Sequence, residues 1–181
     1  MPLEEHNAQL RAVIEQNQRT LERMQQLLAA LEKSISSNPR DGAPENKVIL
    51  IVDDNLHEAR ELERSVQRWR LLTRLQIVSD GAQAISYIKG DGLYHDRARF
   101  PEPLLLFLDL KMPSVDGFHV LDWLKQHPQY ATFPVVVMSG LGETKQINRA
   151  YHLGARSFLT KPVDPEEVKA TLETLCIPIL A

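Results

Sequence analysis

Length, composition and charge narrow the classes of protein to which this chain can belong. It has 181 residues, 43% of them hydrophobic, so we expect one domain plus an appendage in a soluble, cytoplasmic protein with no secretory signal. The net charge of -3 argues against a basic surface for nucleic acid, the single cysteine excludes an internal disulfide, and no apolar run is long enough to cross a membrane.

Two columns of mostly apolar residues repeat every seven positions between residues 3 and 35. One column holds Asn7, Ile14, Leu21, Leu28 and Ile35, and the other holds Leu3, Leu10, Asn17, Met24 and Leu31. This pattern predicts that residues 1–36 form a helix that pairs with a second copy as a parallel coiled coil. The alternative is an amphipathic helix folded back on its own domain, because Val13 and Leu27 widen the apolar stripe.

The periodicity stops after this segment. The text SSNPRDGAPENK is rich in Ser, Pro, Gly and Asn, which is typical of a linker. We therefore expect a linker over 37–46 and a second domain over 47–181.

From Lys47 onward, short apolar runs alternate with amphipathic segments. The predicted strands are 48–52, 75–78, 104–108, 135–138 and 157–160, and the predicted helices are 56–70, 81–89, 117–126, 143–153 and 165–176. Five strands alternating with five helices indicate an α/β fold, a doubly wound parallel sheet covered by helices on both faces.

Polar side chains follow four of these strands. Asp53 and Asp54 follow the first, Asp109 the third, Ser139 the fourth, and Lys161 comes just after the fifth. Because the carboxyl ends of parallel strands share one edge, these side chains should converge. Neighbouring carboxylates repel each other by up to about 4 kcal/mol per pair, which Mg²⁺ would relieve, while the lysine and the serine suit a phosphoryl group.

Each of these residues also has an ordinary interpretation when it is taken alone. Asp53 and Asp54 could cap the helix that follows, and Ser139 with the next glycine could form a turn. Lys161 followed by Pro162 could simply end a strand. It is the joint occurrence of all these residues that favours a functional site.

Four stretches resemble the receiver domain of bacterial response regulators, which accept a phosphoryl group from a histidine kinase. They are VILIVDDN, LLLFLDLKMPSVDG, VVVMSG and GARSFLTKP, in the family's order and spacing over residues 47–176. The resemblance implies a flavodoxin-like (βα)5 fold with strand order 2-1-3-4-5. It also implies that Asp109 is the phosphoacceptor.

The resemblance further implies a role for each remaining residue of the site. Mg²⁺ would be held by Asp54, Asp109 and the backbone carbonyl of Lys111, and Asp53 would act through water. Lys161 would pair with the phosphoryl oxygens and Ser139 would donate a hydrogen bond to them. Phe158 corresponds to the family's switching aromatic residue, and the bond between Lys161 and Pro162 is often cis in the family.

Two further segments, KGDGLYHDRARFPEP and YHLGARSFLTKPVDPEEV, resemble the single-domain regulators that serve phytochrome-type kinases. Such regulators commonly dimerise through the fourth helix, fifth strand and fifth helix. We expect a homodimer here through that face, through the coiled coil, or through both. We expect no output domain after residue 176, so function should rest on phosphotransfer or phosphorylation-dependent binding. Any enzymatic activity should be limited to autophosphorylation from small donors and slow autodephosphorylation.

Three other functions deserve comparison. A haloacid-dehalogenase-like phosphatase needs a second Asp two residues after the first, where this chain has Lys111. A flavodoxin-like flavin binder needs a phosphate-binding loop in place of Asp53 and Asp54. A constitutive scaffold would bind partners through the coiled coil, and replacing Asp109 by Asn would then leave partner binding unchanged.

Overall fold

The computed structural model describes residues 47–69, 73–140 and 144–177. The predicted coiled-coil helix and linker lie outside these residues, so both remain predictions. The strands are β1 (Val48–Val52), β2 (Arg74–Val78), β3 (Pro103–Asp109), β4 (Val135–Ser139) and β5 (Ser157–Thr160). They form one parallel sheet in the order β2-β1-β3-β4-β5, which confirms the predicted fold class and strand order.

Five α-helices and two short 3₁₀ helices connect the strands in the described part of the chain. The α-helices are α2 (Leu56–Gln67), α3 (Gly81–Lys89), α4 (Gly117–Gln126), α5 (Thr144–His152) and α6 (Pro165–Thr174), and the 3₁₀ helices are η2 (Gly92–Tyr94) and η3 (Pro128–Tyr130). The first and last α-helices end earlier than predicted, and the 3₁₀ helices were not predicted. None of these helices has the length and apolarity that crossing a membrane requires.

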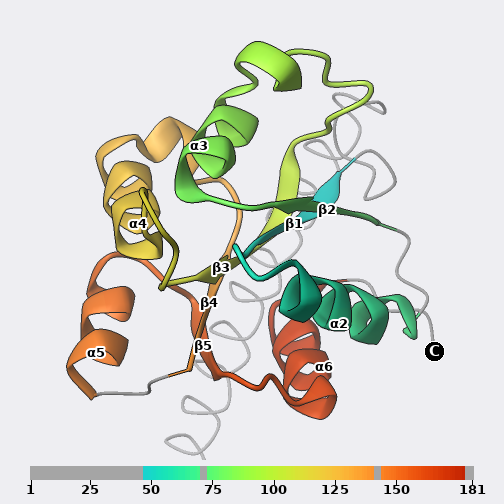
Figure 1. Ribbon diagram of the computed structural model, residues 1–181, viewed down its shortest axis with the longest axis vertical. Helices are drawn as coiled ribbons and strands as arrows, with labels where there is room; N and C mark the ends of the chain where they lie inside the picture. Colours follow the sequence, from blue (N-terminus) through green and yellow to red (C-terminus); the bar gives the residue numbers. More distant parts are fainter. Residues whose placement is uncertain (1–46, 70–72, 141–143, 178–181) are drawn as a thin grey trace, which may run out of the picture. The chain divides into compact units, whose positions relative to one another are not determined.

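The helices cover the two faces of the sheet as separate layers (Figure 1). Helices α2 and α6 lie on one face, and α3, α4 and α5 lie on the other. Successive side chains of a strand point to opposite faces, so each strand contributes to two cores. In β1, for example, Ile49 and Ile51 pack in the core under α2 and α6, whereas Leu50 packs in the core under α3 and α4. This double burial explains why the strands read as continuous apolar runs.

A long connection joins α3 to β3 and is held by one arginine. Gly90 ends α3 with a left-handed backbone, φ 75°, which suits a residue without a Cβ. The Arg97 guanidinium donates hydrogen bonds to the carbonyls of Tyr87 (2.9 Å), Ile88 (2.8 Å) and Phe100 (3.3 Å). These bonds satisfy carbonyls at the end of α3 and fix the chain where it enters β3.

Candidate phosphoryl and metal site

The carboxyl ends of four strands bring the predicted polar residues to one edge of the sheet. Asp53 directly follows β1, Asp109 is the last residue of β3 and Ser139 is the last residue of β4. Lys161 directly follows β5. Because β1 pairs with β3, β3 with β4 and β4 with β5, all in parallel, these residues come from adjacent strands although 108 positions separate the first from the last.

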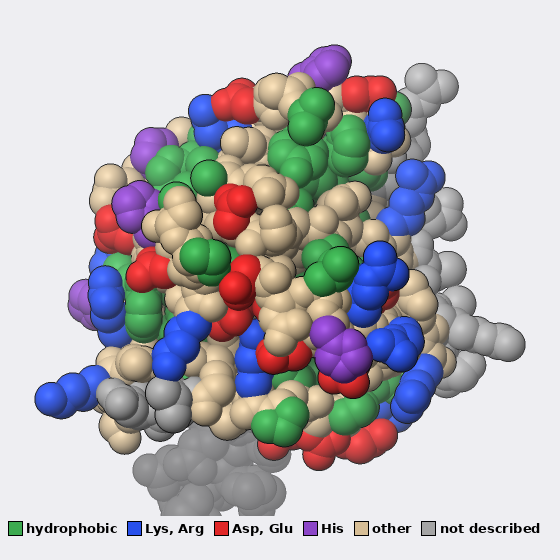
Figure 2. Space-filling model, in the orientation of Figure 1, with side chains coloured by type: hydrophobic (Ala, Val, Ile, Leu, Met, Phe, Trp, Pro, Cys, Tyr) green, Lys and Arg blue, Asp and Glu red, His purple; other side chains and the backbone are tan. Residues whose placement is uncertain are grey.

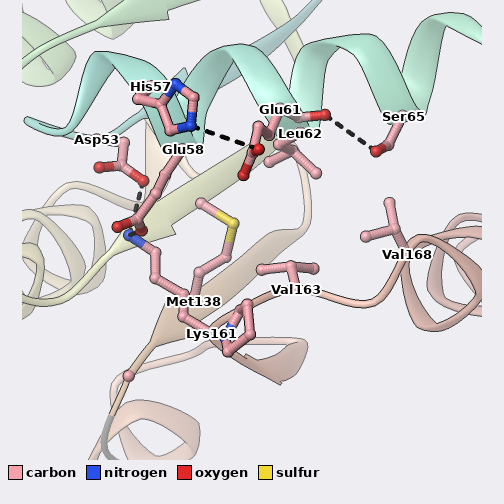
Figure 3. A pocket seen from close by; sticks show the side chains of 12 residues that line it. Asp53, His57, Glu58, Glu61, Leu62, Ser65, Met138, Lys161, Val163 and Val168 are labelled. Atoms are coloured by element: carbon pink, nitrogen blue, oxygen red, sulfur yellow. Dashed lines mark hydrogen bonds and ion pairs between the residues drawn. The ribbon is translucent and has the colours of Figure 1, made fainter.

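The Lys161 ammonium is the centre of the site. Its Nζ atom donates to Asp53 Oδ2 and Asp109 Oδ2, at 2.7 Å each, and lies 3.0 Å from Glu58 Oε2. Figure 3 shows Asp53, Glu58 and Lys161 meeting at one end of a pocket. The side chains are 1% exposed for Asp53, 8% for Asp109, 12% for Lys161 and 43% for Glu58. Three of the four charged groups are therefore shielded from water, which strengthens the attraction between them.

Three carboxylates of the site are close enough to share one cation. Oxygen atoms of Asp53, Asp54 and Asp109 all lie within 4.8 Å of one another, with Asp54 exposed and the other two buried. Together with Glu58 they give the site four carboxylates and the one ammonium of Lys161, which leaves three formal negative charges. A small group of hard oxygen donors with an excess of negative charge suits Mg²⁺ or Mn²⁺, so the residues fit a divalent ion.

The pKa values of Asp53 and Lys161 are both raised, which favours the neutral form of the aspartate and the charged form of the lysine. Burial raises the pKa of Asp53 above its usual range, and the hydrogen bond from Lys161 only partly opposes this. Burial also lowers the pKa of Lys161, but the hydrogen bonds to Asp109, Asp53 and Glu58 outweigh it and raise the pKa overall. The lysine is thus a fixed positive charge, whereas the negative charge of Asp53 is held at a cost in free energy.

The Ser139 hydroxyl is buried and has no hydrogen-bond partner in the described part of the chain. Among the described residues, no group forms a hydrogen bond with its Oγ atom, although the side chain is fully buried. Its backbone carbonyl accepts from the Lys161 amide at 3.0 Å, so the hydroxyl is held at the same edge as the lysine. A buried hydroxyl without a partner is uncommon and indicates a place for a polar ligand.

The loop between β1 and α2 excludes the ordinary interpretation of Asp53 and Asp54 as helix caps. Neither Asp53 nor Asp54 caps α2; the Asn55 side chain does so by accepting from the amides of His57 and Glu58. Asp53 Oδ1 instead accepts from the Asn55 amide at 2.9 Å. Asp53 is turned inward, because its other oxygen binds Lys161, and Asn55, two positions later, takes the capping position.

Glu58 is the residue of the site that sequence reasoning missed. In the sequence, Glu58 looks like an ordinary solvent-exposed residue in the first turn of α2. A signal was present, since an N-cap residue followed three positions later by Glu is the pattern of a capping box, and Asn55 and Glu58 have this spacing. The pattern indicates a glutamate turned back toward the loop, which is where Lys161 lies.

A groove of about 540 Å³ adjoins the site (Figure 3). Side chains of α2 form one wall, including His57 and Glu61, and the segment after β5 forms the other, including Val163. Figure 2 shows acidic side chains gathered near the centre of the face drawn there, with a basic side chain beside them. The groove is also lined by Asp53, Glu58 and Lys161, so it leads to the charged site from the side of α2.

The remaining predicted residues lie where the sequence indicated. Phe158 is in β5, paired with Val137, and its half-buried ring packs against the core under α3 and α4. The peptide bond between Lys161 and Pro162 is cis, as predicted. The Lys111 amide donates to Asp109 Oδ1 at 3.0 Å, which holds the backbone of Lys111 beside the Asp109 carboxylate.

Comparison with known proteins agrees with this arrangement. Residues 49–173 match the family described as the response regulator receiver domain. The response regulator Rcp1 of Synechocystis sp. is 32% identical over 115 residues, which are 64% of this chain and 76% of that protein.

Two solved structures are similar over most of their length. The crystal structure of the phosphorylated cyanobacterial phytochrome response regulator RcpA gives a TM-score of 0.64 at 28% identity, over 72% of this chain and 94% of that one. The Mn²⁺-bound form of Rcp1 gives a TM-score of 0.62 at 28% identity, over 75% of this chain and 99% of that one.

Proposed function

Because the chain belongs to the response regulator receiver family, and resembles the single-domain regulators of phytochromes, we propose that it accepts a phosphoryl group on Asp109. The observation that carries this proposal is the Asp109 carboxylate bound at 2.7 Å to Lys161, whose side chain is 12% exposed, beside two further aspartates. The donor is the phosphohistidine of a sensor histidine kinase, of the phytochrome-linked type that the relatives' names indicate.

The proposed reaction is a direct transfer. A carboxylate oxygen of Asp109 attacks the phosphorus atom, the bond from phosphorus to the histidine nitrogen breaks, and its electron pair leaves with that nitrogen. Lys161 stabilises the negative charge on the phosphoryl oxygens, so the protein contributes mainly position and charge. No further catalytic function is proposed, apart from autophosphorylation from small donors and slow loss of the phosphoryl group.

The metal ion belongs to the same site. Asp54, Asp109 and the backbone carbonyl of Lys111 would hold Mg²⁺, with Asp53 acting through water. When bound, the ion neutralises charge on the aspartates and on the incoming phosphoryl oxygens.

Ser139 and Phe158 are the proposed switch. The phosphoryl group brings a charge of about -1.5 to -2, which the unpartnered Ser139 hydroxyl can meet by donating a hydrogen bond. Movement of Ser139 toward Asp109 opens space for the half-buried Phe158 ring to turn inward. If the exposure of Phe158 is the same with and without a phosphoryl mimic, the switch lies elsewhere.

The signal leaves the domain through an interaction between proteins in the cytoplasm. We place this interaction on a homodimer formed by the predicted coiled coil of residues 1–36, by the face of α5, β5 and α6, or by both. The spacing of apolar residues in the first segment and the family resemblance support these two surfaces.

The test is the mass of the intact protein after incubation with acetyl phosphate and Mg²⁺, for the wild type and for Asp109→Asn. A labile gain of one phosphoryl group by the wild type only is the expected result. Light scattering on the same samples reports whether the assembly changes. No gain in the wild type would refute the proposal and would favour a scaffold that works through residues 1–36.

A further inference from the structure

We propose that Glu58 is a positioning residue for phosphoryl transfer, which holds the Lys161 ammonium in place. The inference rests on the proposed function. None of the resemblances assigned a role to this position. The argument starts from the two groups that face the Glu58 carboxylate.

The Glu58 carboxylate joins the loop before α2 to the lysine of the site. Its Oε1 atom accepts from the Asn55 side-chain amide at 2.6 Å, and its Oε2 atom lies 3.0 Å from Lys161 Nζ. In an ordinary capping box, a glutamate at this position binds the backbone amide of the N-cap residue. Here Asp53 already accepts from that amide, at 2.9 Å. Glu58 is therefore free to reach Lys161.

Both neighbours of this carboxylate are donors. Asn55 must present its nitrogen, because its oxygen accepts from the helix amides of His57 and Glu58. Lys161 can only donate. A carboxylate accepts from both at once, whereas a glutamine would place its own NH₂ group against one of the two donors. The position thus requires a carboxylate rather than any polar side chain of the same shape.

The ammonium of Lys161 uses its three N–H groups on three carboxylates. These are Asp53, Asp109 and Glu58. When Asp109 becomes an acyl phosphate, its carboxylate loses its charge and the ammonium turns one N–H to a phosphoryl oxygen. Asp53 would also serve the metal ion through water, so Glu58 is the carboxylate that still holds the flexible lysine side chain.

The test measures how fast Asp109 is phosphorylated by acetyl phosphate and Mg²⁺ in full-length variants. Glu58→Gln should lower the rate constant at saturating donor by about fivefold, the upper range for a partly exposed ion pair. The donor concentration at half-maximal rate should stay unchanged, because Glu58 touches the lysine and not the donor. Glu58→Ala removes both acceptor atoms and should slow the reaction at least as much.

Glu61→Gln is the matched control. Glu61 lies one turn further along α2, lines the same groove and pairs with His57 at 3.5 Å, and its side chain is 61% exposed. Glu61→Gln removes one negative charge from the α2 wall of the groove, as Glu58→Gln does, but Glu61 does not contact Lys161. The phosphorylation rate should therefore stay at the wild-type value. Equal losses in Glu61→Gln and Glu58→Gln would overturn the inference, because charge alone would explain both.

A double variant shows whether Glu58 acts through Lys161. Adding Glu58→Gln to Lys161→Gln should cause no further loss, whereas independent residues would give the product of the two losses. A further fivefold loss in the double variant would overturn the inference, as would a normal rate in Glu58→Gln. The proposed function fails in a different way, since in that case even the wild type gains no phosphoryl group. Urea midpoints of all variants report whether each is folded.

Discussion

Removing the Ser139 hydroxyl should stabilise the unphosphorylated protein, although most substitutions in a core destabilise. The Oγ atom is fully buried and has no hydrogen-bond partner among the described residues. Keeping an unpaired hydroxyl out of water costs about 1 to 3 kcal/mol in proteins. Ser139→Ala removes this cost and leaves a cavity of only one oxygen atom, so we expect a net gain of about 1 kcal/mol in the free energy of unfolding.

The assay is urea unfolding without Mg²⁺ or phosphate donor. With a slope of about 2 kcal/mol per molar urea, the gain corresponds to a rise of about 0.5 M in the midpoint. Ser65→Ala is the control, because the Ser65 hydroxyl does have a partner, the Glu61 carbonyl at 2.9 Å. That variant should be neutral or slightly less stable. A loss of 1 kcal/mol or more in Ser139→Ala would refute the reasoning, since it would mean that the hydroxyl is already bonded.

When a phosphoryl mimic is bound, Ser139→Ala should be less stable than the wild type, the opposite of the effect expected in the unphosphorylated protein. A hydrogen bond to a charged group contributes about 1.5 to 3 kcal/mol, and Ser139 is placed to donate one. Beryllofluoride with Mg²⁺ should therefore raise the unfolding free energy of the wild type more than that of Ser139→Ala. An equal increase in both proteins would show that this hydroxyl does not meet the phosphoryl group.

Two further predictions concern the same edge of the sheet. A Cβ at Gly117 would lie 2.2 Å from the Asp109 carbonyl oxygen, a backbone atom that cannot move aside, whereas a Cβ at Gly140 meets no atom of the described residues within 4 Å. Gly117→Ala should therefore lose about 2 kcal/mol of stability in urea unfolding, and Gly140→Ala should lose little. Because burial raises the pKa of Asp53 above the ordinary value of 3.8, its charge destabilises the folded state as the pH rises through the raised pKa. Without Mg²⁺, Asp53→Asn should therefore gain stability over the wild type as the pH is raised from about 4 to 7, and a constant difference over that range would contradict this.

The sequence predicts most of the fold because the three central strands, β1, β3 and β4, are buried on both faces. Runs such as 48–52 and 104–108 are continuously apolar, and only a parallel sheet between two layers of helices buries every residue of such a run. The shared edge then places Asp53, Asp109 and Lys161 together without any knowledge of distances. Element ends were less accurate, since the end of α6 at Thr174 depends on how the following residues turn.

What the sequence could not supply is the competition between neighbouring hydrogen-bond acceptors. Asp53, Asp54 and Asn55 are all good N-cap residues, and sequence preference does not separate them. Lys161, more than 100 positions away, binds Asp53 and so removes it from the choice, and Asn55 is the residue that caps α2. The role of Glu58 depends in turn on that choice, because Asp53 takes the amide that Glu58 would otherwise bind.

Two departures from ordinary folding rules occur at this edge of the sheet. Asp53 is a buried carboxylate whose pKa burial raises, and Ser139 is a buried hydroxyl without a partner. Each lowers stability in the isolated domain, and each faces the place where a cation and a phosphoryl group would lie. A ligand that binds the folded state stabilises it, so the proposed Mg²⁺ and phosphoryl group would each offset one of these losses. The phosphorylated state would then be stabilised relative to the resting state by the interactions that the resting state lacks, and a switch requires such a difference in free energy between its two states.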